Sequence, residues 1–110
     1  MTLSEKQQRV TFLAARLIDW AYLNGYTLTL GQAWRTTEQQ EIYIKQGLSR
    51  TKGSKHLDRL AIDLNLFVNG EYKTATEDYR PLGEFWKLLD PECVWGGDWG
   101  FDGNHFQYGQ

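Results

Sequence analysis

The chain has 110 residues, with 12 basic and 14 acidic side chains and a formal net charge of −2. A chain of this length buries roughly 65% of the surface that its unfolded form exposes, which supports one core and one domain over residues 1–110. Without a basic excess, nucleic acid is excluded as the main partner. No apolar run approaches the ~18 residues that a membrane span needs, so we also expect no membrane partner.

Cysteine usage and the start of the chain suggest where the protein is made. Cys93 is the single cysteine, so no intramolecular disulfide can form, and we expect it to be a buried structural thiol. The first ten residues, MTLSEKQQRV, lack a basic-then-apolar leader. We therefore expect a protein that is made in a reducing cytoplasm.

Three segments have the apolar spacing of amphipathic helices. The first covers residues 4–24, where Ser4 and Gln7 fit a capping box and Gly25 fits a stop. The second begins with Thr37 and Gln40, which fit another capping box, and runs toward Gly47. The third covers residues 78–89 and ends before a proline.

The strand-forming segments lie mostly between these helices. Residues 26–34 and 60–68 are rich in strand formers, and Asn69-Gly70 directly after the second segment predicts a hairpin turn. Residues 48–55 predict a surface loop. The last twenty residues predict a short strand, a glycine-rich turn and a closing strand. This order favours the α+β class, an antiparallel sheet packed against helices.

The two histidines of the chain lie near carboxylates in strand-like segments. The period of two places Asp63 on the face of its strand opposite Leu64 and Leu66, beside the small Ala61. His105 likewise lies opposite Phe106 on the closing strand. If these two strands pair, Asp63 and His105 face the same cleft.

Two imidazoles and one carboxylate form a three-ligand zinc site with a fourth position open, which is typical of catalytic zinc. We therefore consider His56, Asp63 and His105 as metal ligands, while a structural role for each histidine stays open. Asp102, three residues before His105, is the candidate general base. Asp58 and Asp98 are the alternative bases, but neither has a fixed spacing to a ligand.

Two separated motifs carry a family resemblance. Ser54-Lys55-His56 followed by Ala61-Ile62-Asp63-Leu64 resembles the S-x-H-x(6)-D pattern of the M15 zinc peptidases, the D-alanyl-D-alanine carboxypeptidase and L-alanyl-D-glutamate endopeptidase group. The ending Asp102-Gly103-Asn104-His105-Phe106 is similar to the second signature of that group. With the stretch upstream of the first motif, the resemblance spans about residues 30 to 108. It implies the α+β fold shared by hedgehog proteins and D-Ala-D-Ala peptidases.

The resemblance also implies residue roles. The implied zinc ligands are His56, Asp63 and His105. Asp102 is then the general base, Arg35 stabilises the oxyanion or orients the substrate, and Ser54 contacts the substrate beside the metal. The chain departs from the family pattern at Arg59, where a glycine is usual, and Trp34 directly precedes the arginine.

Other residues have two readings each. Trp95 and Trp99, which lie among glycines, either line a substrate groove and stack on sugar or peptide, or belong to the core or a hinge. Arg50, Lys52 and Lys55 form a small basic cluster that is either a solvated loop or an attraction for an acidic peptide stem.

From the resemblance we expect a zinc-dependent murein peptidase that hydrolyses an amide bond in the stem peptide of bacterial peptidoglycan, an L-alanyl-D-glutamate endopeptidase of the phage or prophage lysis type. It would act as a monomer, made in the cytoplasm and released to the cell wall. The alternatives are a D-alanyl-D-alanine carboxypeptidase or dipeptidase, and a non-catalytic zinc-stabilised cell-wall-binding module.

Overall fold

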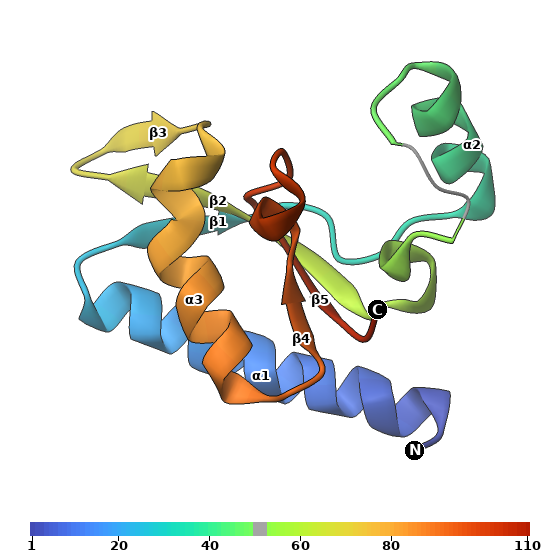
Figure 1. Ribbon diagram of the computed structural model, residues 1–110, viewed down its shortest axis with the longest axis horizontal. Coiled ribbons are helices and arrows are strands. Elements are labelled where there is room, and N and C mark those ends of the chain that lie inside the picture. Colours follow the sequence, from blue (N-terminus) through green and yellow to red (C-terminus); the bar gives the residue numbers. More distant parts are fainter. Residues whose placement is uncertain (50–52) are drawn as a thin grey trace.

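The computed structural model describes residues 1–49 and 53–110. Within them, three α-helices and a five-stranded antiparallel sheet are joined by three short 3-10 helices (Figure 1). In chain order the elements are α1 (Leu3–Leu23), β1 (Thr27–Leu30), α2 (Thr37–Lys45), η1 (Lys55–Asp58), β2 (Ala61–Val68), β3 (Glu71–Lys73), η2 (Thr76–Tyr79), α3 (Arg80–Leu89), β4 (Cys93–Trp95), η3 (Gly96–Trp99) and β5 (His105–Tyr108). The expected α+β class is confirmed.

The long strand β2 organises the sheet. The strand order is β1-β2-β5-β4, and β3 also pairs with β2 through the predicted hairpin. Asn69 and Gly70 have φ angles of 52° and 80°, as a two-residue turn of the type favoured in hairpins requires. β5 lies between β2 and β4, antiparallel to both, so the C-terminal strand is central in the sheet.

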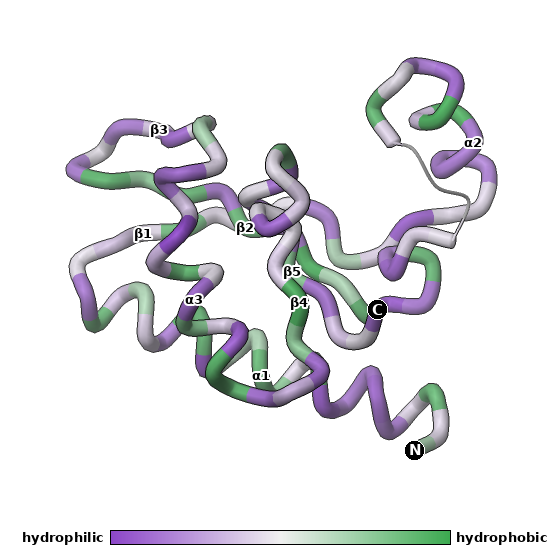
Figure 2. Tube along the Cα trace, viewed as in Figure 1, coloured by the Kyte–Doolittle hydropathy of each residue, from purple (hydrophilic) through white to green (hydrophobic). Residues whose placement is uncertain are grey.

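The helices α1 and α3 pack on one face of the sheet, while α2 lies apart from both (Figure 1). Figure 2 shows hydrophobic stretches at the centre of the molecule, where these two helices meet the strands. The buried core is drawn from both helices and from β2, β4 and β5: Val10, Leu13, Leu17, Leu64, Leu66, Leu82, Trp86, Trp95, Phe106 and Tyr108. Among the described residues, no helix combines the length and the apolar character that a membrane crossing requires.

The helices begin at different residues from those expected. The capping box of α1 joins Thr2 and Glu5, not Ser4 and Gln7, and α2 is capped by Thr36, whose side chain accepts from the Gln39 backbone. An N-cap residue has an extended backbone, and Thr2 and Thr36 have ψ angles of 166° and 159°. The third predicted helix is divided into η2 and α3.

The first strand is shorter than residues 26–34, but the backbone beyond it still pairs with β2. The Gly31 amide donates to the Asp63 carbonyl at 2.8 Å, and the Asp63 amide donates to the Gln32 carbonyl at 2.9 Å. This pairing holds the backbone of Asp63 on both sides, since β5 pairs with β2 at the same residue. In the predicted loop over residues 48–55, residues 50–52 lie outside the described residues, and Lys55 begins η1.

Trp95 is fully buried and lies between two glycines. A Cβ atom added to Gly83 of α3 or to Gly97 of η3 would lie 2.1 Å from an atom of the Trp95 ring. No side chain fits in that space, so the backbones of α3 and η3 contact the indole ring directly at these two glycines. The two glycines therefore set how closely α3 packs on the sheet.

Gly83→Ala tests this packing. In an exposed helix interior this change stabilises a protein by about 1 kcal/mol. Here the added methyl group overlaps the Trp95 ring, so we expect the free energy of unfolding to fall by about 2–3 kcal/mol in urea denaturation. The control is Leu88→Ala on the same helix, where the side chain is 82% exposed and the change should stay within about 0.5 kcal/mol. Equal or higher stability of Gly83→Ala would contradict the packing described.

Candidate metal centre

A cleft of about 800 Å³ opens on the side of β2 opposite the core. Residues from α2, η1, β2 and β5, and from the segments that follow β1 and η3, line it. It contains seven of the residues selected from the sequence: Arg35, Ser54, His56, Asp63, Trp99, Asp102 and His105. The fold therefore brings together side chains that lie up to 70 positions apart, from position 35 to position 105.

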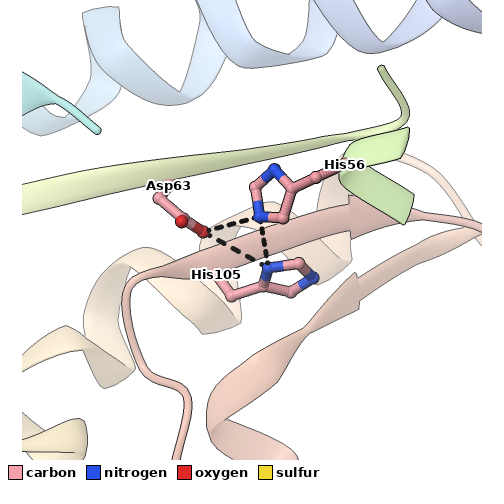
Figure 3. Close-up of side chains that lie close together, drawn as sticks. All are labelled: His56, Asp63 and His105. Carbon is pink, nitrogen blue, oxygen red and sulfur yellow. Dashed lines mark hydrogen bonds and ion pairs between the residues drawn. The ribbon is translucent and has the colours of Figure 1, made fainter. Parts of the chain in front are cut away.

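Three of the side chains that line this cleft converge on one another (Figure 3). The Nε2 atom of His56 lies 3.1 Å from Oδ1 of Asp63 and 3.2 Å from Nδ1 of His105. The third side of the triangle, from His105 Nδ1 to Asp63 Oδ1, is 3.3 Å. Both histidines are buried. Three potential ligand atoms thus face one point.

The strand register positions two of these side chains. Asp63 is directly opposite His105 in the antiparallel β2–β5 pair. Residues opposite each other in such a pair project to the same face of the sheet, so the carboxylate and the imidazole are neighbours. The sequence-based expectation that pairing of these strands places Asp63 and His105 in one cleft is confirmed.

His56 reaches the same point from the short helix η1, and hydrogen bonds to its own backbone hold it in position. The Ser54 hydroxyl accepts a hydrogen bond from the His56 amide at 3.3 Å, and the His56 carbonyl accepts from the Arg35 amide at 3.2 Å. The helix ends at Arg59 in a left-handed conformation with φ 56° and ψ 35°. A glycine adopts this conformation without steric cost, and glycine is the residue that the resemblance implies at this position. The Arg59 guanidinium lies 4.8 Å from the centre of the Trp34 ring.

Gln107 fixes the orientation of His105. The Gln107 amide nitrogen donates to the Gly109 carbonyl at 2.7 Å, which turns its Oε1 toward His105 Nε2, also at 2.7 Å. Nε2 therefore carries a proton, and Nδ1 points to the cluster, where it donates to Asp63 when protonated and can bind an ion when it is not. His56 is oriented by packing instead, because its buried Nδ1 has no hydrogen-bond partner among the described residues and its ring packs edge-on against His105.

The arrangement fits a small divalent cation. Ligands bonded to zinc at about 2.0–2.1 Å in a tetrahedron lie about 3.3–3.4 Å apart, close to the three distances found here. Burial works to raise the pKa of the Asp63 carboxyl, but hydrogen bonds from His105 and His56 outweigh it and hold that pKa below its usual value. Asp63 is thus ionised, as a metal ligand must be. Among the described residues, these three form the one group of His, Cys, Asp or Glu side chains close enough to share an ion.

Two glycines leave space for the cluster. A Cβ on Gly96 would lie 2.3 Å from the Asp102 carbonyl oxygen and 2.9 Å from Cβ of His105. A Cβ on Gly31 would lie 2.9 Å from Cβ of Asp63. Any larger residue at either position would displace the backbone that carries a candidate ligand.

Asp102 lies beside the cluster without joining it. Its Oδ2 is 3.9 Å from His105 Nδ1, farther than the three converging atoms are from one another. Burial raises the pKa of the Asp102 carboxyl above its usual value, and the nearby His105 opposes that rise. A carboxylate of raised pKa at the edge of a cleft suits a proton acceptor.

Arg35 is held in the cleft wall by neutral groups. Its Nε donates to Gln32 at 2.7 Å, and Nη1 donates to the Gln40 side chain and to Ser54 at 3.3 Å. The guanidinium also lies 4.7 Å from the centre of the Tyr43 ring. Because none of these partners carries negative charge, the positive charge of Arg35 is left for a ligand in the cleft.

Some candidates from the sequence are not in the cleft. The structure corrects the expectation that Trp95 contacts substrate: the indole is fully buried between α3 and η3, so only its core reading fits. Asp98 pairs with Lys87 at 2.8 Å, and neither Asp98 nor Asp58 lines the cleft. Cys93 is buried as expected, and burial raises the pKa of its thiol to about 12. Of the basic cluster, Lys55 lines the cleft, while Arg50 and Lys52 lie outside the described residues.

The sequence reasoning missed several residues that hold the site. Gln107 shares a strand face with His105, a pattern that was visible but had no assigned role. Gln40 was assigned to a capping box, although its buried side chain joins Arg35 to the Ser49 hydroxyl. No pattern in the sequence singles out Gln32, because its contact with Arg35 forms only in the folded chain.

Comparison with known proteins identifies the family. The sequence profile of the D-alanyl-D-alanine carboxypeptidase family of M15 peptidases matches residues 48–108, more than half of the chain. The chain therefore belongs to the M15 peptidase family. It is 35% identical over 101 residues to the L-alanyl-D-glutamate peptidase of Listeria phage A118. That match covers 86% of this chain but 35% of the phage protein, so the chain spans about a third of the length of this relative.

Solved structures show the same fold. The Serratia marcescens L-Ala D-Glu endopeptidase ChiX matches with a TM-score of 0.76 and 20% identity, over 96% of this chain and 84% of ChiX. VanYB in complex with D-alanine-D-alanine matches with a TM-score of 0.60 and 23% identity, over 93% of this chain and 70% of VanYB. The E175A mutant of VanY from the VanB-type resistance cassette, solved with Zn(II), gives 0.57 and 24%, over 91% and 70%.

Trp95 also anchors the turn that carries Asp102. Its indole nitrogen donates to the Gly103 carbonyl at 2.7 Å, between Asp102 and His105 in the chain. Trp95→Phe keeps most of the ring but leaves that buried carbonyl without its donor. We expect the free energy of unfolding to fall by about 2 kcal/mol in urea denaturation.

Trp99→Phe is the matched control, because the Trp99 side chain is half exposed and its nitrogen has no hydrogen-bond partner in residues 1–49 and 53–110. Its change should stay within about 0.5 kcal/mol. Equal stabilities of the two variants would show that the bond to Gly103 contributes nothing.

Proposed function

We propose that this chain is a zinc-dependent peptidase domain, spanning residues 1–110, that hydrolyses the L-alanyl-D-glutamate bond in the stem peptide of bacterial peptidoglycan. The observation that carries the proposal is the convergence of His56 Nε2, Asp63 Oδ1 and His105 Nδ1 within 3.1–3.3 Å, beside a carboxylate and a guanidinium. The choice of bond follows the phage relative, which is an L-alanyl-D-glutamate peptidase.

His56, Asp63 and His105 would hold the zinc ion and leave its fourth position open. When bound, zinc polarises a carbonyl group and lowers the pKa of water to about 7. Zinc is the ion in the VanY complex, whose fold this chain shares. A purely structural site would close the fourth position with another protein ligand, and the described residues bring only three together.

Asp102 would act as the general base. Its carboxylate lies beside the cluster, where it can accept a proton from the attacking water and pass it to the nitrogen of the leaving amine. The raised pKa of Asp102 favours this proton transfer, because a carboxylate whose pKa is above the usual value is a stronger base than an ordinary aspartate.

Arg35 would stabilise the negative oxygen that develops on the scissile carbonyl. The neutral hydrogen-bond partners that hold the guanidinium keep it oriented and leave its charge unpaired. An oriented cation of this kind stabilises the transition state more than the neutral ground state. Ser54, which contacts Arg35, would add a hydrogen bond to the substrate beside the metal.

A D-alanyl-D-alanine carboxypeptidase is the second candidate, because the matching family profile bears that description. One experiment separates the two. Purified protein is incubated with muropeptides, with and without a chelator, and the fragments are weighed by mass spectrometry. We expect release of a peptide beginning with D-glutamate, abolished by the chelator and restored by zinc. Loss of a terminal D-alanine alone would instead support the carboxypeptidase.

The ligand set predicts the metal content of three variants. His56→Ala, Asp63→Ala and His105→Ala should each lower zinc occupancy sharply from about one ion per chain, because a site with two protein ligands is weak. Elemental analysis after dialysis measures the occupancy, and circular dichroism checks that each variant is folded. Asp58→Ala is the control and should retain its zinc. Full occupancy in any two of the three variants would refute the site.

Asp102→Asn separates proton transfer from metal binding. Asparagine has nearly the same shape but cannot accept the proton, so turnover should fall by about 100 to 10,000-fold while zinc and fold are kept. Asp98→Asn is the matched control, since Asp98 lies near in sequence but pairs with Lys87 outside the cleft. Loss of zinc in Asp102→Asn would make Asp102 a ligand, and unchanged turnover would place the base elsewhere.

A further inference from the structure

Trp99 is exposed beside the candidate metal centre. Its side chain lines the cleft, and 46% of the residue remains exposed. The centre of its ring lies 5.4 Å from that of His105, at a tilt of 41°. Trp86 and Trp95, by contrast, are fully buried in the core. The fold thus keeps Trp99 exposed at the rim of the cluster, with the Phe101 ring beside it at a centroid distance of 6.2 Å.

The chemistry of this position suits a ring with one apolar face and polar edges. The indole offers a flat apolar surface, and its nitrogen has no hydrogen-bond partner within residues 1–49 and 53–110, so it can still donate. Asp102 also neighbours His105, with its Oδ2 3.9 Å from Nδ1, and its carboxylate disfavours an acidic ligand near that ring. An uncharged ring with hydroxyl and amide groups fits both features.

Two cationic side chains line the same cleft from other elements. Lys55 lies in η1 and Arg35 in the segment before α2, and neither forms an ion pair with a carboxylate within residues 1–49 and 53–110. The cleft is therefore cationic on the side of η1 and α2 and aromatic on the side of η3. A substrate with an acidic part and an uncharged ring has one preferred direction in such a cleft.

We propose that Trp99 forms a binding site for the amino-sugar ring to which the stem peptide is attached, on the acyl side of the scissile bond. This inference rests on the proposed function. In peptidoglycan, L-alanine is joined to the sugar through a lactyl group, so the ring lies about two residue lengths, or about 7 Å, from the L-alanyl carbonyl. The acidic D-glutamate then lies toward Arg35 and Lys55.

The distance makes the site specific to this bond. For hydrolysis between two terminal D-alanines, the sugar would lie about five residue lengths, or about 17 Å, from the scissile carbonyl. That is beyond a side chain in contact with the metal centre. A sugar site at Trp99 therefore belongs to the L-alanyl-D-glutamate reaction and not to the carboxypeptidase reaction.

The test compares two substrates with the same scissile bond. One is N-acetylmuramyl-L-alanyl-D-glutamyl-L-lysine, and the other has an acetyl group in place of the sugar. We expect the wild-type kcat/KM to be about tenfold higher for the muramyl substrate, equivalent to about 1.4 kcal/mol. In Trp99→Ala this ratio should fall to about one, and Trp99→Phe should restore part of it.

Trp34→Ala is the matched control. Trp34 is exposed to a similar extent, 49%, but does not line the cleft, so the substrate ratio should stay as in the wild type. Zinc content is measured for every variant. An unchanged ratio in Trp99→Ala, or a wild type without preference for the sugar, would overturn the proposal. So would an equal loss on both substrates together with loss of zinc, because Trp99 would then only shield the metal centre.

Failure of the proposed function would look different. Wild-type protein would leave both substrates intact while releasing D-alanine from a D-alanyl-D-alanine peptide, and that result would overturn both proposals together. Cleavage of both substrates at equal rates would overturn the sugar site alone.

Discussion

The pairing of Asp63 with His105 across β2 and β5 is the constraint on which the site depends. In an antiparallel sheet, a slip of one residue moves every side chain of a strand to the other face. Such a slip of β2 would turn Asp63 into the core, toward Phe106, and would expose Leu64 in the cleft. The hydrophobic effect that fixes the core therefore also fixes the distance between two candidate ligands.

Several residues around Asp63 and His105 position the polar side chains of the buried cluster. Gln107 orients His105, the turn at η1 presents His56, and glycines give the backbone room at Gly31 and Gly96. None of these residues supplies a candidate metal ligand except His56 and His105; the others position the ligands. Together they keep three ligand atoms facing one point before any ion binds, which limits the reorganisation that binding would require.

The sequence predicted the parts of the site that follow from a period of two. The alternation along residues 60–68 and in the ending HFQY placed Asp63 and His105 each on the face opposite the apolar residues, because a strand has only two faces, while the pairing of β2 with β5 that brings them into one cleft comes from the fold. Helix starts were less well predicted. Ser, Thr, Gln and Glu recur around both N-termini, so several capping boxes fit, and only the backbone angles select Thr2 and Thr36.

That small error hid the contact between Gln40 and Arg35. With Thr37 as the cap, the Gln40 side chain would bond to the Thr37 backbone; with Thr36 as the cap, it accepts from Arg35 instead. The two tryptophans near the glycine-rich turn could not be told apart locally either. Trp95 is buried because Gly83 of α3, a residue of another segment, packs against its ring. Trp99 lies at the end of η3, between β4 and β5, and lines the cleft.

A crystal grown with zinc, with anomalous diffraction recorded at the zinc absorption edge, tests the central claim most directly. The account predicts one strong peak bonded to His56 Nε2, Asp63 Oδ1 and His105 Nδ1 at about 2.0–2.1 Å, with the fourth position facing the cleft and Asp102 unbonded. A peak bonded elsewhere, or an ion whose fourth ligand is a protein side chain, would contradict it.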